Sequence, residues 1–269
     1  MENMLRKYWQ GKRILITGAS SGLGWALAEA LAPFGVHLGL MSRREQKLQE
    51  LAETLRDTGS RFWIRACDVR QREAVIRAVQ DFAAEASGLD VVWANSGVGY
   101  ESSMRHWEWD EIEAMLDTNL KGAIYTIKAA LDVMVPQRSG TVVGICSAAS
   151  MRGLPLHGIY SVTKIGLAYF MESMAVELPS IQFTTIHPGY VDTPINAGNP
   201  NRFWLLQPPE AAQKMIRAVA KKKHVYTYPW QMMLLYRLVH AVPAWIYVPV
   251  MRKMGRLALR GAGKKKKDQ

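Results

Sequence analysis

The chain has 269 residues, 49% of them hydrophobic and 21% charged, which suffices for the core of one large α/β domain or of two small ones. Its two cysteines, Cys67 and Cys146, lie inside apolar runs, and its first residues lack the apolar stretch of a secretory signal. We therefore expect no disulfide framework and a cytoplasmic setting. The net charge of +11 belongs to a tail, because eight basic residues face one acid between Arg252 and Gln269. The body carries no basic stripe or recognition motif, so we expect no nucleic-acid partner.

Short apolar runs alternate with longer amphipathic segments from residue 13 to residue 187. The runs predict six buried strands, at 13–17, 36–41, 62–66, 89–94, 140–146 and 181–187. Helical patterns lie between them, at 23–34, 44–57, 72–86, 109–134 and 160–178. Since the strands are nearly all apolar and alternate with helices, the sequence predicts a doubly wound α/β fold, with a parallel sheet covered on both faces.

A glycine-rich turn connects the first predicted strand to the first predicted helix. Its sequence, from Thr17 to Gly24, is TGASSGLG. Glycine permits left-handed backbone and close approach of a phosphate, and the helix N-terminus offers N–H groups to a pyrophosphate. A plain strand–helix turn is the alternative, but the strand before and the helix after the glycines favour a nucleotide. The residues expected to line this cofactor site are Gly18, Ser20, Ser21, Gly22, Leu23 and Gly24.

A second group of polar residues predicts acid/base chemistry. Tyr160 and Lys164 are four residues apart on a predicted helix and so project from one face, and Ser147 follows the fifth strand. A free tyrosine has a pKa of about 10 and is a poor base near neutrality, but a nearby ammonium group would lower that pKa. Ser147 would hydrogen-bond a substrate oxygen and hold it against the tyrosine hydroxyl. We therefore expect hydride transfer to or from a carbonyl or alcohol carbon, and no metal.

The turn and the polar group together resemble the classical short-chain dehydrogenase/reductase family over roughly residues 11–227. Thr17 to Gly24 matches its TGxxxGxG fingerprint, and the Ser147, Tyr160 and Lys164 spacing matches its Ser-Tyr-x-x-x-Lys pattern. The resemblance implies a three-layer Rossmann fold with a mostly parallel sheet of about seven strands. It also implies that Lys164 holds the nicotinamide ribose and that Asn119, in Thr-Asn-Leu-Lys-Gly, anchors a water that leads protons from the lysine to solvent.

The resemblance assigns further cofactor contacts. Asp68 and Val69 correspond to an adenine-contacting Asp-Val pair. Residues 94–97 read Ala-Asn-Ser-Gly where the family usually has Asn-Asn-Ala-Gly, and we expect this change to weaken the local hydrogen bonds that lock the sheet. The full set implied in these two segments and in the segment after the sixth strand is Asp68, Val69, Asn95, Ser96, Gly97, Pro188, Gly189, Val191 and Thr193.

The residues after the second strand bear on the choice of dinucleotide. An acidic residue there would bind the ribose 2′-hydroxyl and repel a 2′-phosphate, but the sequence has Ser42, Arg43 and Arg44. An arginine fork and a serine hydroxyl suit a phosphate. The alternative is that both arginines merely begin a solvated helix. NADP(H) is favoured over NAD(H).

The chain changes character after residue 228. We expect a dinucleotide-binding oxidoreductase domain at 1–228 and an apolar, then basic, C-terminal extension at 229–269. The longest charge-free stretch, 238–251, is too short and too interrupted to span a membrane. The extension suits either a membrane surface contacted through 230–267, on the cytoplasmic face, or a cap on the substrate pocket or a subunit interface.

These features together predict an NADP(H)-dependent oxidoreductase for a hydrophobic carbonyl or alcohol. The apolar segment 190–206, which corresponds to the family's mobile substrate lid, adds to that expectation. A non-catalytic NADP(H)-binding module tethered at a membrane is the alternative, although the intact Ser147, Tyr160 and Lys164 count against it. The resemblance implies a homodimer or homotetramer packed through the helices of Asn119 and Tyr160. His157 is expected in the substrate loop and His187 in a structural role.

Overall fold

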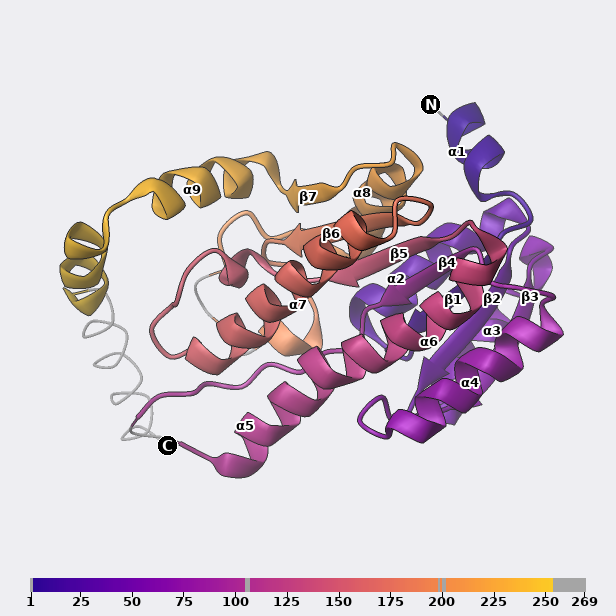
Figure 1. The fold of residues 1–269 in the computed structure, drawn as a ribbon, viewed down its shortest axis with the longest axis horizontal. Helices are drawn as coiled ribbons and strands as arrows, with labels where there is room; N and C mark the ends of the chain where they lie inside the picture. Colours follow the sequence, from indigo (N-terminus) through magenta and orange to yellow (C-terminus); the bar gives the residue numbers. More distant parts are fainter. Residues whose placement is uncertain (1, 105–106, 198, 200–201, 254–269) are drawn as a thin grey trace.

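A computed structural model describes residues 2–104, 107–197, 199 and 202–253. The sheet has seven strands, all parallel, in the order β3-β2-β1-β4-β5-β6-β7 (Figure 1). The strands are β1 (Arg13–Thr17), β2 (His37–Ser42), β3 (Arg61–Ala66), β4 (Val91–Ala94), β5 (Thr141–Ile145), β6 (Gln182–Pro188) and β7 (Val225–Tyr228). The doubly wound fold is confirmed. β7 is a strand that the apolar pattern did not locate, because two of its four residues are tyrosines and only Tyr228 is fully buried.

Helices cover both faces of the sheet, as the apolar strands predicted. The helices are α1 (Glu2–Trp9), α2 (Gly22–Leu31), α3 (Glu45–Thr54), α4 (Arg72–Glu85), α5 (Trp109–Met115), α6 (Gly122–Gln137), α7 (Gly158–Glu177), α8 (Pro208–Ala220), α9 (Trp230–Ala241) and a further helix, Ala244–Lys253. Side chains from α1, α2, α3 and α8 join one buried cluster, and those from α4, α6 and α7 join the other. The fold therefore has three layers.

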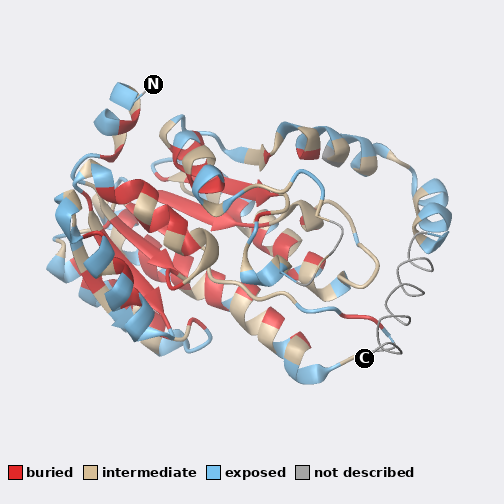
Figure 2. Cartoon of the chain, turned by 180° about the vertical axis from the view of Figure 1, so that it is seen from behind, coloured by how far each residue is buried: buried red, intermediate tan, exposed pale blue. Residues whose placement is uncertain are grey.

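Strand residues alternate between these two clusters with the period of two that a pleated strand imposes. Ile14 and Ile16 of β1 belong to the cluster under α2, whereas Leu15 between them belongs to the cluster under α4. Ile14 lies opposite Leu38 on one side and Val91 on the other, so β1 is central. The five inner strands are buried almost throughout, whereas the edge strands β3 and β7 are partly exposed (Figure 2).

The order of the strands reverses at β1, because β2 and β3 lie on one side of it and β4 to β7 on the other. In open α/β sheets a ligand binds at the carboxyl ends of the strands next to such a reversal. The turn after β1 and the loops after β4 and β5 all leave the sheet at this edge.

The C-terminal extension leaves β7 and runs beyond the carboxyl edge of the sheet (Figure 1). Within the described ranges no single helix has the length and apolar composition to cross a membrane, whereas α9 and Ala244–Lys253 do so only as a pair bent by 118°. The basic residues predicted to follow, Arg256 to Lys267, lie outside the described residues.

Candidate active site

The glycine-rich turn between β1 and α2 has the backbone that its sequence predicts. Gly18 (φ +70°) and Gly22 (φ +56°) lie in the left-handed region, which disfavours other residues. A Cβ at Gly24 would lie 2.3 Å from the carbonyl oxygen of Gly18, so α2 packs directly on the turn. The turn therefore leaves its backbone and the N-terminus of α2 open to a phosphate-bearing ligand.

Arg44 ties the end of β2 to this turn. Its Nη2 donates to Ser20 Oγ (2.9 Å) and to Ser21 Oγ (2.7 Å), and its own backbone N–H donates to Ser42 Oγ (3.1 Å). Arg43 beside it is exposed. Sequence reasoning grouped these residues as cofactor contacts but did not foresee that Arg44 would bridge β2 and the turn. The bridge joins residues more than twenty positions apart, so it follows only from the pairing of β1 with β2.

Asp68 and Val69 follow β3. Asp68 forms an ion pair with Arg70 (2.6 Å), whose hydrogen bonds lower the pKa of this carboxyl group. Val69 is buried against α6, where a Cβ at Gly122 would lie 2.8 Å from Val69 Cγ2. The pair thus lies at the carboxyl edge of the sheet, with the carboxylate held as an anion.

The segment after β4 remains tied to β1 despite its altered sequence. Asn95 Nδ2 donates to the carbonyl oxygen of Thr17 (2.9 Å), and the N–H groups of Asn95 and Ser96 both donate to Thr17 Oγ1 (3.1 and 3.2 Å). Thr17 Oγ1 in turn donates to the carbonyl oxygen of Trp93 (3.2 Å). The sheet edge is therefore still locked, by Thr17 and Asn95.

Asn119 lies in a π-helical turn, Leu116–Lys121, between α5 and α6. The pattern predicted an uninterrupted helix over 109–134; the structure has this wider turn instead, a local irregularity that recurs at functional sites. The buried Asn119 side chain accepts from the N–H of Val98 and donates to its carbonyl oxygen (2.8 Å each), and it also donates to Thr163 Oγ1 (3.3 Å). Asn119 therefore joins the loop after β4 to α7.

The catalytic candidates converge at the carboxyl end of β5. The side chains of Tyr160 and Ser147 lie next to each other. Desolvation by the surrounding protein raises the pKa of Tyr160 to about 12, and the Ser147 hydroxyl offsets part of that rise. Lys164 Nζ lies 5.8 Å from the centre of the Tyr160 ring and donates to the carbonyl oxygen of Ile145 (2.9 Å).

The electrostatics of this group differ from the expectation. Lys164 was predicted to lower the pKa of Tyr160, but burial dominates and the pKa is raised. Burial also lowers the pKa of Lys164, whose ammonium group is directed to the Ile145 carbonyl oxygen. In this state Tyr160 holds its proton at neutral pH.

Buried polar contacts hold the backbone of Ser147. His187 Nδ1 lies 2.9 Å from Ser150 Oγ and 3.2 Å from the carbonyl oxygen of Ser147, and Ser150 Oγ donates to that same oxygen (2.5 Å). Burial lowers the pKa of His187, so the ring is neutral at physiological pH. His187 has the structural role that the sequence predicted. His157, whose pKa burial also lowers, directly precedes α7.

The segment after β6 lies over the turn and over Tyr160. Pro188 ends β6, and the N–H of Gly189 donates to the carbonyl oxygen of Tyr228 (2.7 Å). Val191 pairs with Leu206 in an isolated bridge. A Cβ at Gly22 would lie 3.2 Å from Thr193 Cγ2. A Cβ at Gly99 would lie 2.9 Å from Ile195 Cγ2 and 3.7 Å from the Tyr160 ring. The described part of this segment thus brings an apolar side chain next to Tyr160.

Arg152 lies in the loop between Ser147 and α7, and sequence reasoning did not single it out. It donates from Nη1 to the carbonyl oxygens of Val239 (2.8 Å) and Val242 (2.5 Å), and its guanidinium group stacks 4.1 Å from the centre of the Tyr247 ring. Tyr247 returns a hydrogen bond from its hydroxyl to the carbonyl oxygen of Gly153 (2.7 Å). The only sequence signal was a single charged residue in the loop 148–158.

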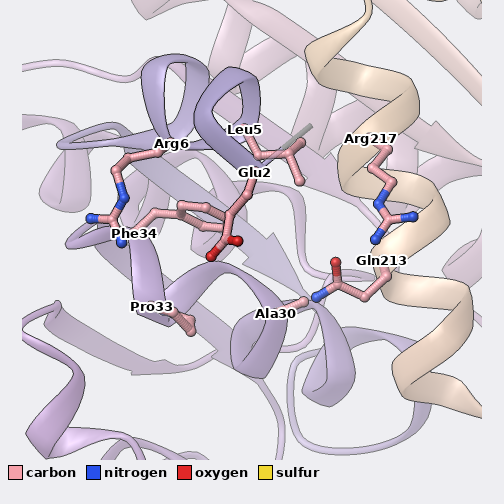
Figure 3. Close-up of a pocket in the computed structure, with 8 residues that line it drawn as sticks. All are labelled: Glu2, Leu5, Arg6, Ala30, Pro33, Phe34, Gln213 and Arg217. Carbon is pink, nitrogen blue, oxygen red and sulfur yellow. The ribbon is translucent and has the colours of Figure 1, made fainter.

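A separate hollow of ≈ 560 Å³ lies between α1, α2 and α8 (Figure 3). Its lining mixes charged and apolar side chains, Glu2, Leu5, Arg6, Ala30, Pro33, Phe34, Gln213 and Arg217. Its lining includes none of Ser147, Tyr160 and Lys164, so it is separate from the group around Tyr160.

Comparison with known proteins gives one consistent result. Residues 12–202 match the model of the short chain dehydrogenase family. An uncharacterized oxidoreductase of Myxococcus xanthus is 34% identical over 89% of this chain and 96% of its own length, and one of Staphylococcus aureus is 33% identical over 80% and 93%. An alcohol dehydrogenase of Thermococcus sibiricus, solved in complex with 5-hydroxy-NADP, superposes with a TM-score of 0.74 at 31% identity, over 81% of this chain and 95% of that one. A short-chain type dehydrogenase/reductase of Mycobacterium marinum gives 0.75 at 26% identity, over 81% and 94%.

Proposed function

The chain belongs to the short-chain dehydrogenase/reductase family of oxidoreductases, and on that premise we propose that it transfers a hydride between NADP(H) and a hydrophobic carbonyl or alcohol, with Tyr160 as the general acid/base. The observation that carries the proposal is the convergence of Ser147, Tyr160 and Lys164 at the carboxyl edge of the sheet, beside the glycine-rich turn. The family's chemistry favours a catalyst over the non-catalytic module that the sequence left open.

The residues at this edge fit a dinucleotide. Gly18 and Gly22 have left-handed backbone, and Gly24 lies where any side chain would strike the carbonyl oxygen of Gly18, so the turn can approach a pyrophosphate closely. Asp68 and Val69 would face the adenine, as in the family whose pattern they match. When bound, the cofactor supplies or accepts the hydride.

The preference for NADP(H) rests on the arginines that follow β2. Arg43 is exposed and lies near enough to Asp68 to lower the pKa of its carboxyl group, and Arg44 reaches across to the serines of the turn, so we place both arginines at the ribose end of the proposed site. Arginine donates paired hydrogen bonds to phosphate oxygens. The Thermococcus sibiricus relative, solved with an NADP analogue, is in keeping with this preference.

The side chains around Tyr160 have distinct proposed tasks. The side chains of Ser147 and Tyr160 are neighbours, so both hydroxyl groups are placed to bind one substrate oxygen. With its pKa raised, Tyr160 donates its proton to the oxygen of a carbonyl that is being reduced, and must lose that proton before it can serve alcohol oxidation. Lys164 would hold the nicotinamide ribose. Asn119 and Lys164 both border Gly97, where a Cβ would lie 3.3 and 3.4 Å from their polar atoms.

The proposed substrate is apolar because the side chains next to Tyr160 and in the segment after β6 are apolar. Ile195 lies next to Gly99 and Tyr160, and Phe203 packs edge-on against Tyr190 and Trp204 with ring centres 5.1 Å apart in both pairs. The exposed apolar side chains of residues 230–253 also support contact with a membrane surface. The cytoplasmic setting stays a prediction from the sequence.

An oligomer packed through α7 is part of the same proposal. Val162, Tyr169 and Val176 recur every seven residues along this helix and are 52%, 64% and 81% exposed, which forms an apolar stripe on the molecular surface. Such stripes are typical of helix–helix interfaces. Light scattering after size-exclusion chromatography would report a dimer or tetramer; a monomer would contradict this part of the proposal.

The function is tested by a panel of carbonyls and alcohols of increasing chain length, assayed with NADPH, NADP⁺ and their non-phosphorylated counterparts. We expect turnover that rises with the apolar length of the substrate and is faster with the phosphorylated cofactor. If the protein binds NADPH but turns over no member of the panel, the proposal fails.

A further inference from the structure

The C-terminal helices expose an apolar stripe. On α9 the exposed residues recur three and four positions apart: Trp230 is 67% exposed and Leu238 59%, with Met233, Leu234 and Arg237 between them. On the helix Ala244–Lys253 the exposed apolar residues include Trp245, at 77%. Figure 2 shows this part of the chain largely exposed, in contrast to the buried sheet. An apolar surface of this extent on two successive helices indicates a binding surface.

The charge of the extension indicates what binds there. Residues 229–267 carry nine lysines and arginines and no acidic residue; the first acid is Asp268. A second copy of the chain would bring the same positive charge to this surface and be repelled. Helices that expose tryptophan and leucine beside basic residues suit the boundary between headgroups and acyl chains of an anionic membrane.

The opposite side of the extension is fastened to the loop between the two catalytic hydroxyls. Arg152 donates to the carbonyl oxygens of Val239 and Val242 at the end of α9, where backbone acceptors would otherwise lack partners. The same guanidinium group stacks on Tyr247, whose hydroxyl bonds to Gly153. Ser147 precedes this loop and Tyr160 follows it. The position of the extension and that of the loop are therefore coupled through one side chain.

We infer that α9 and the helix Ala244–Lys253 dock on an anionic lipid surface. The contacts of Arg152 with Val239, Val242 and Tyr247, which we call the Arg152 clasp, then hold the loop between Ser147 and Tyr160 next to that surface. An apolar substrate would thus enter from the bilayer. Docking does not depend on the reaction. The entry of substrate from the bilayer rests on the proposed function.

Docking is tested by sedimentation of the full chain with two kinds of vesicle, phosphatidylcholine alone and phosphatidylcholine mixed with phosphatidylglycerol. We expect binding to the mixed vesicles, with each basic residue near the surface contributing about fivefold at low salt. The double variant Trp245→Glu, Leu238→Glu should lower partitioning by about tenfold or more for each lost apolar contact. Trp109→Glu is the matched control, because this tryptophan is 66% exposed on α5, and should bind like the parent chain.

Two outcomes would overturn the docking. Equal pelleting of the parent chain and the double variant would remove this surface as the lipid contact. If neither pellets and the double variant instead loses a subunit by light scattering, then the surface contacts a second copy. Tyr160→Phe should pellet normally, so a failure of the proposed chemistry leaves the docking test intact.

The clasp is tested by Arg152→Ala, with Arg152→Lys as the conservative variant and Arg72→Ala as a surface control. For each variant, the rate on a water-soluble carbonyl is the reference for the rate on a carbonyl dissolved in the bilayer. Arg152→Ala should still pellet with mixed vesicles. It should lose the rate advantage that mixed vesicles give to a carbonyl dissolved in the bilayer, and Arg152→Lys should retain part of that advantage. If Arg152→Ala slows both substrates by the same factor, the clasp merely supports the loop and the inferred entry from the bilayer is wrong.

Discussion

The two sides of the reaction site are built differently. On the nucleotide side, the backbone of Gly24 packs against the carbonyl oxygen of Gly18, and the carbonyl and hydroxyl oxygens of Thr17 accept hydrogen bonds from the loop after β4. On the substrate side, the loop after Ser147 is held to the C-terminal extension by one arginine and one tyrosine. Backbone contacts admit few sequences, whereas a side-chain clasp can be replaced by many others. The 12–202 match to the family covers the turn and the loop after Ser147 alike, whereas the extension lies outside it.

The largest effect should come from a side chain placed in the backbone contact. Gly24→Val would bring Cβ within 2.3 Å of a carbonyl oxygen that cannot move without unpacking α2. We expect the free energy of unfolding to fall by about 3 kcal/mol, the upper part of the range for overpacking. Measurable NADPH binding should also be lost. Urea unfolding and cofactor fluorescence report the two effects.

The matched control for this change lies on the substrate side. A Cβ at Gly153 would meet nothing within 4 Å, so Gly153→Ala should change stability by no more than about 0.5 kcal/mol and leave NADPH binding intact. Equal destabilisation by the two variants would contradict the contrast between the two sides.

A smaller effect, on cofactor binding, is expected when Arg43, which follows β2, is replaced. Arg43→Ala should weaken NADPH binding by about tenfold to a hundredfold, the usual contribution of a hydrogen bond to a charged group. It should leave NADH binding unchanged, because only the 2′-phosphate is lost as a partner. Titration of both cofactors checks this. A parallel loss for NADPH and NADH would show that Arg43 supports the fold and not the phosphate.

The smallest effect is expected at the amino edge of the sheet, where Arg13 donates three hydrogen bonds to the Asp90 carboxylate, two from its guanidinium group (2.8 and 2.7 Å) and one from its backbone N–H (2.9 Å). Burial alone would raise the pKa of Asp90, but the bonds from Arg13 outweigh it and the pKa is lowered. A carboxyl group with a lowered pKa stabilises the fold above its unfolded value of about 4, and this stabilisation is lost as the pH falls through the folded value.

Asp90→Asn should therefore lower the free energy of unfolding by about 1 kcal/mol at pH 7. This difference from the parent chain should shrink below about pH 4. Urea unfolding across this range measures it, with Asp57→Asn, a fully exposed acid, as the control. A cost that is the same at pH 3 and pH 7 would mean that the ion pair is not its source.

The sequence predicted the parts of the molecule that depend on local pattern. Apolar runs such as 140–146 found the buried strands, and the TGxxxGxG turn predicted the left-handed glycines at 18 and 22. The position of Tyr160 and Lys164 on one helix followed from their spacing of four residues. Each of these features is fixed by residues close together in the chain.

Features that depend on distant residues were not predictable in the same way. The raised pKa of Tyr160 arises from the packing around it, while the spacing alone suggested a pKa lowered by Lys164. The π-helical turn at Asn119 depends on that side chain's bonds to Val98. The Arg152 clasp joins residues almost ninety positions apart, so no pattern within the loop could indicate it.

The central claim, that Tyr160 is the acid/base of an NADP(H)-dependent oxidoreductase, is tested most directly by Tyr160→Phe, measured for NADPH binding and for turnover of the best substrate of the panel. Tyr169→Phe, on the exposed side of the same helix, is the control. We predict that Tyr160→Phe binds NADPH like the parent chain while kcat falls by about 10²- to 10⁴-fold, the usual contribution of a general acid or base, and that Tyr169→Phe keeps full activity. A Tyr160→Phe variant that binds NADPH and turns over at the parental rate would contradict the claim.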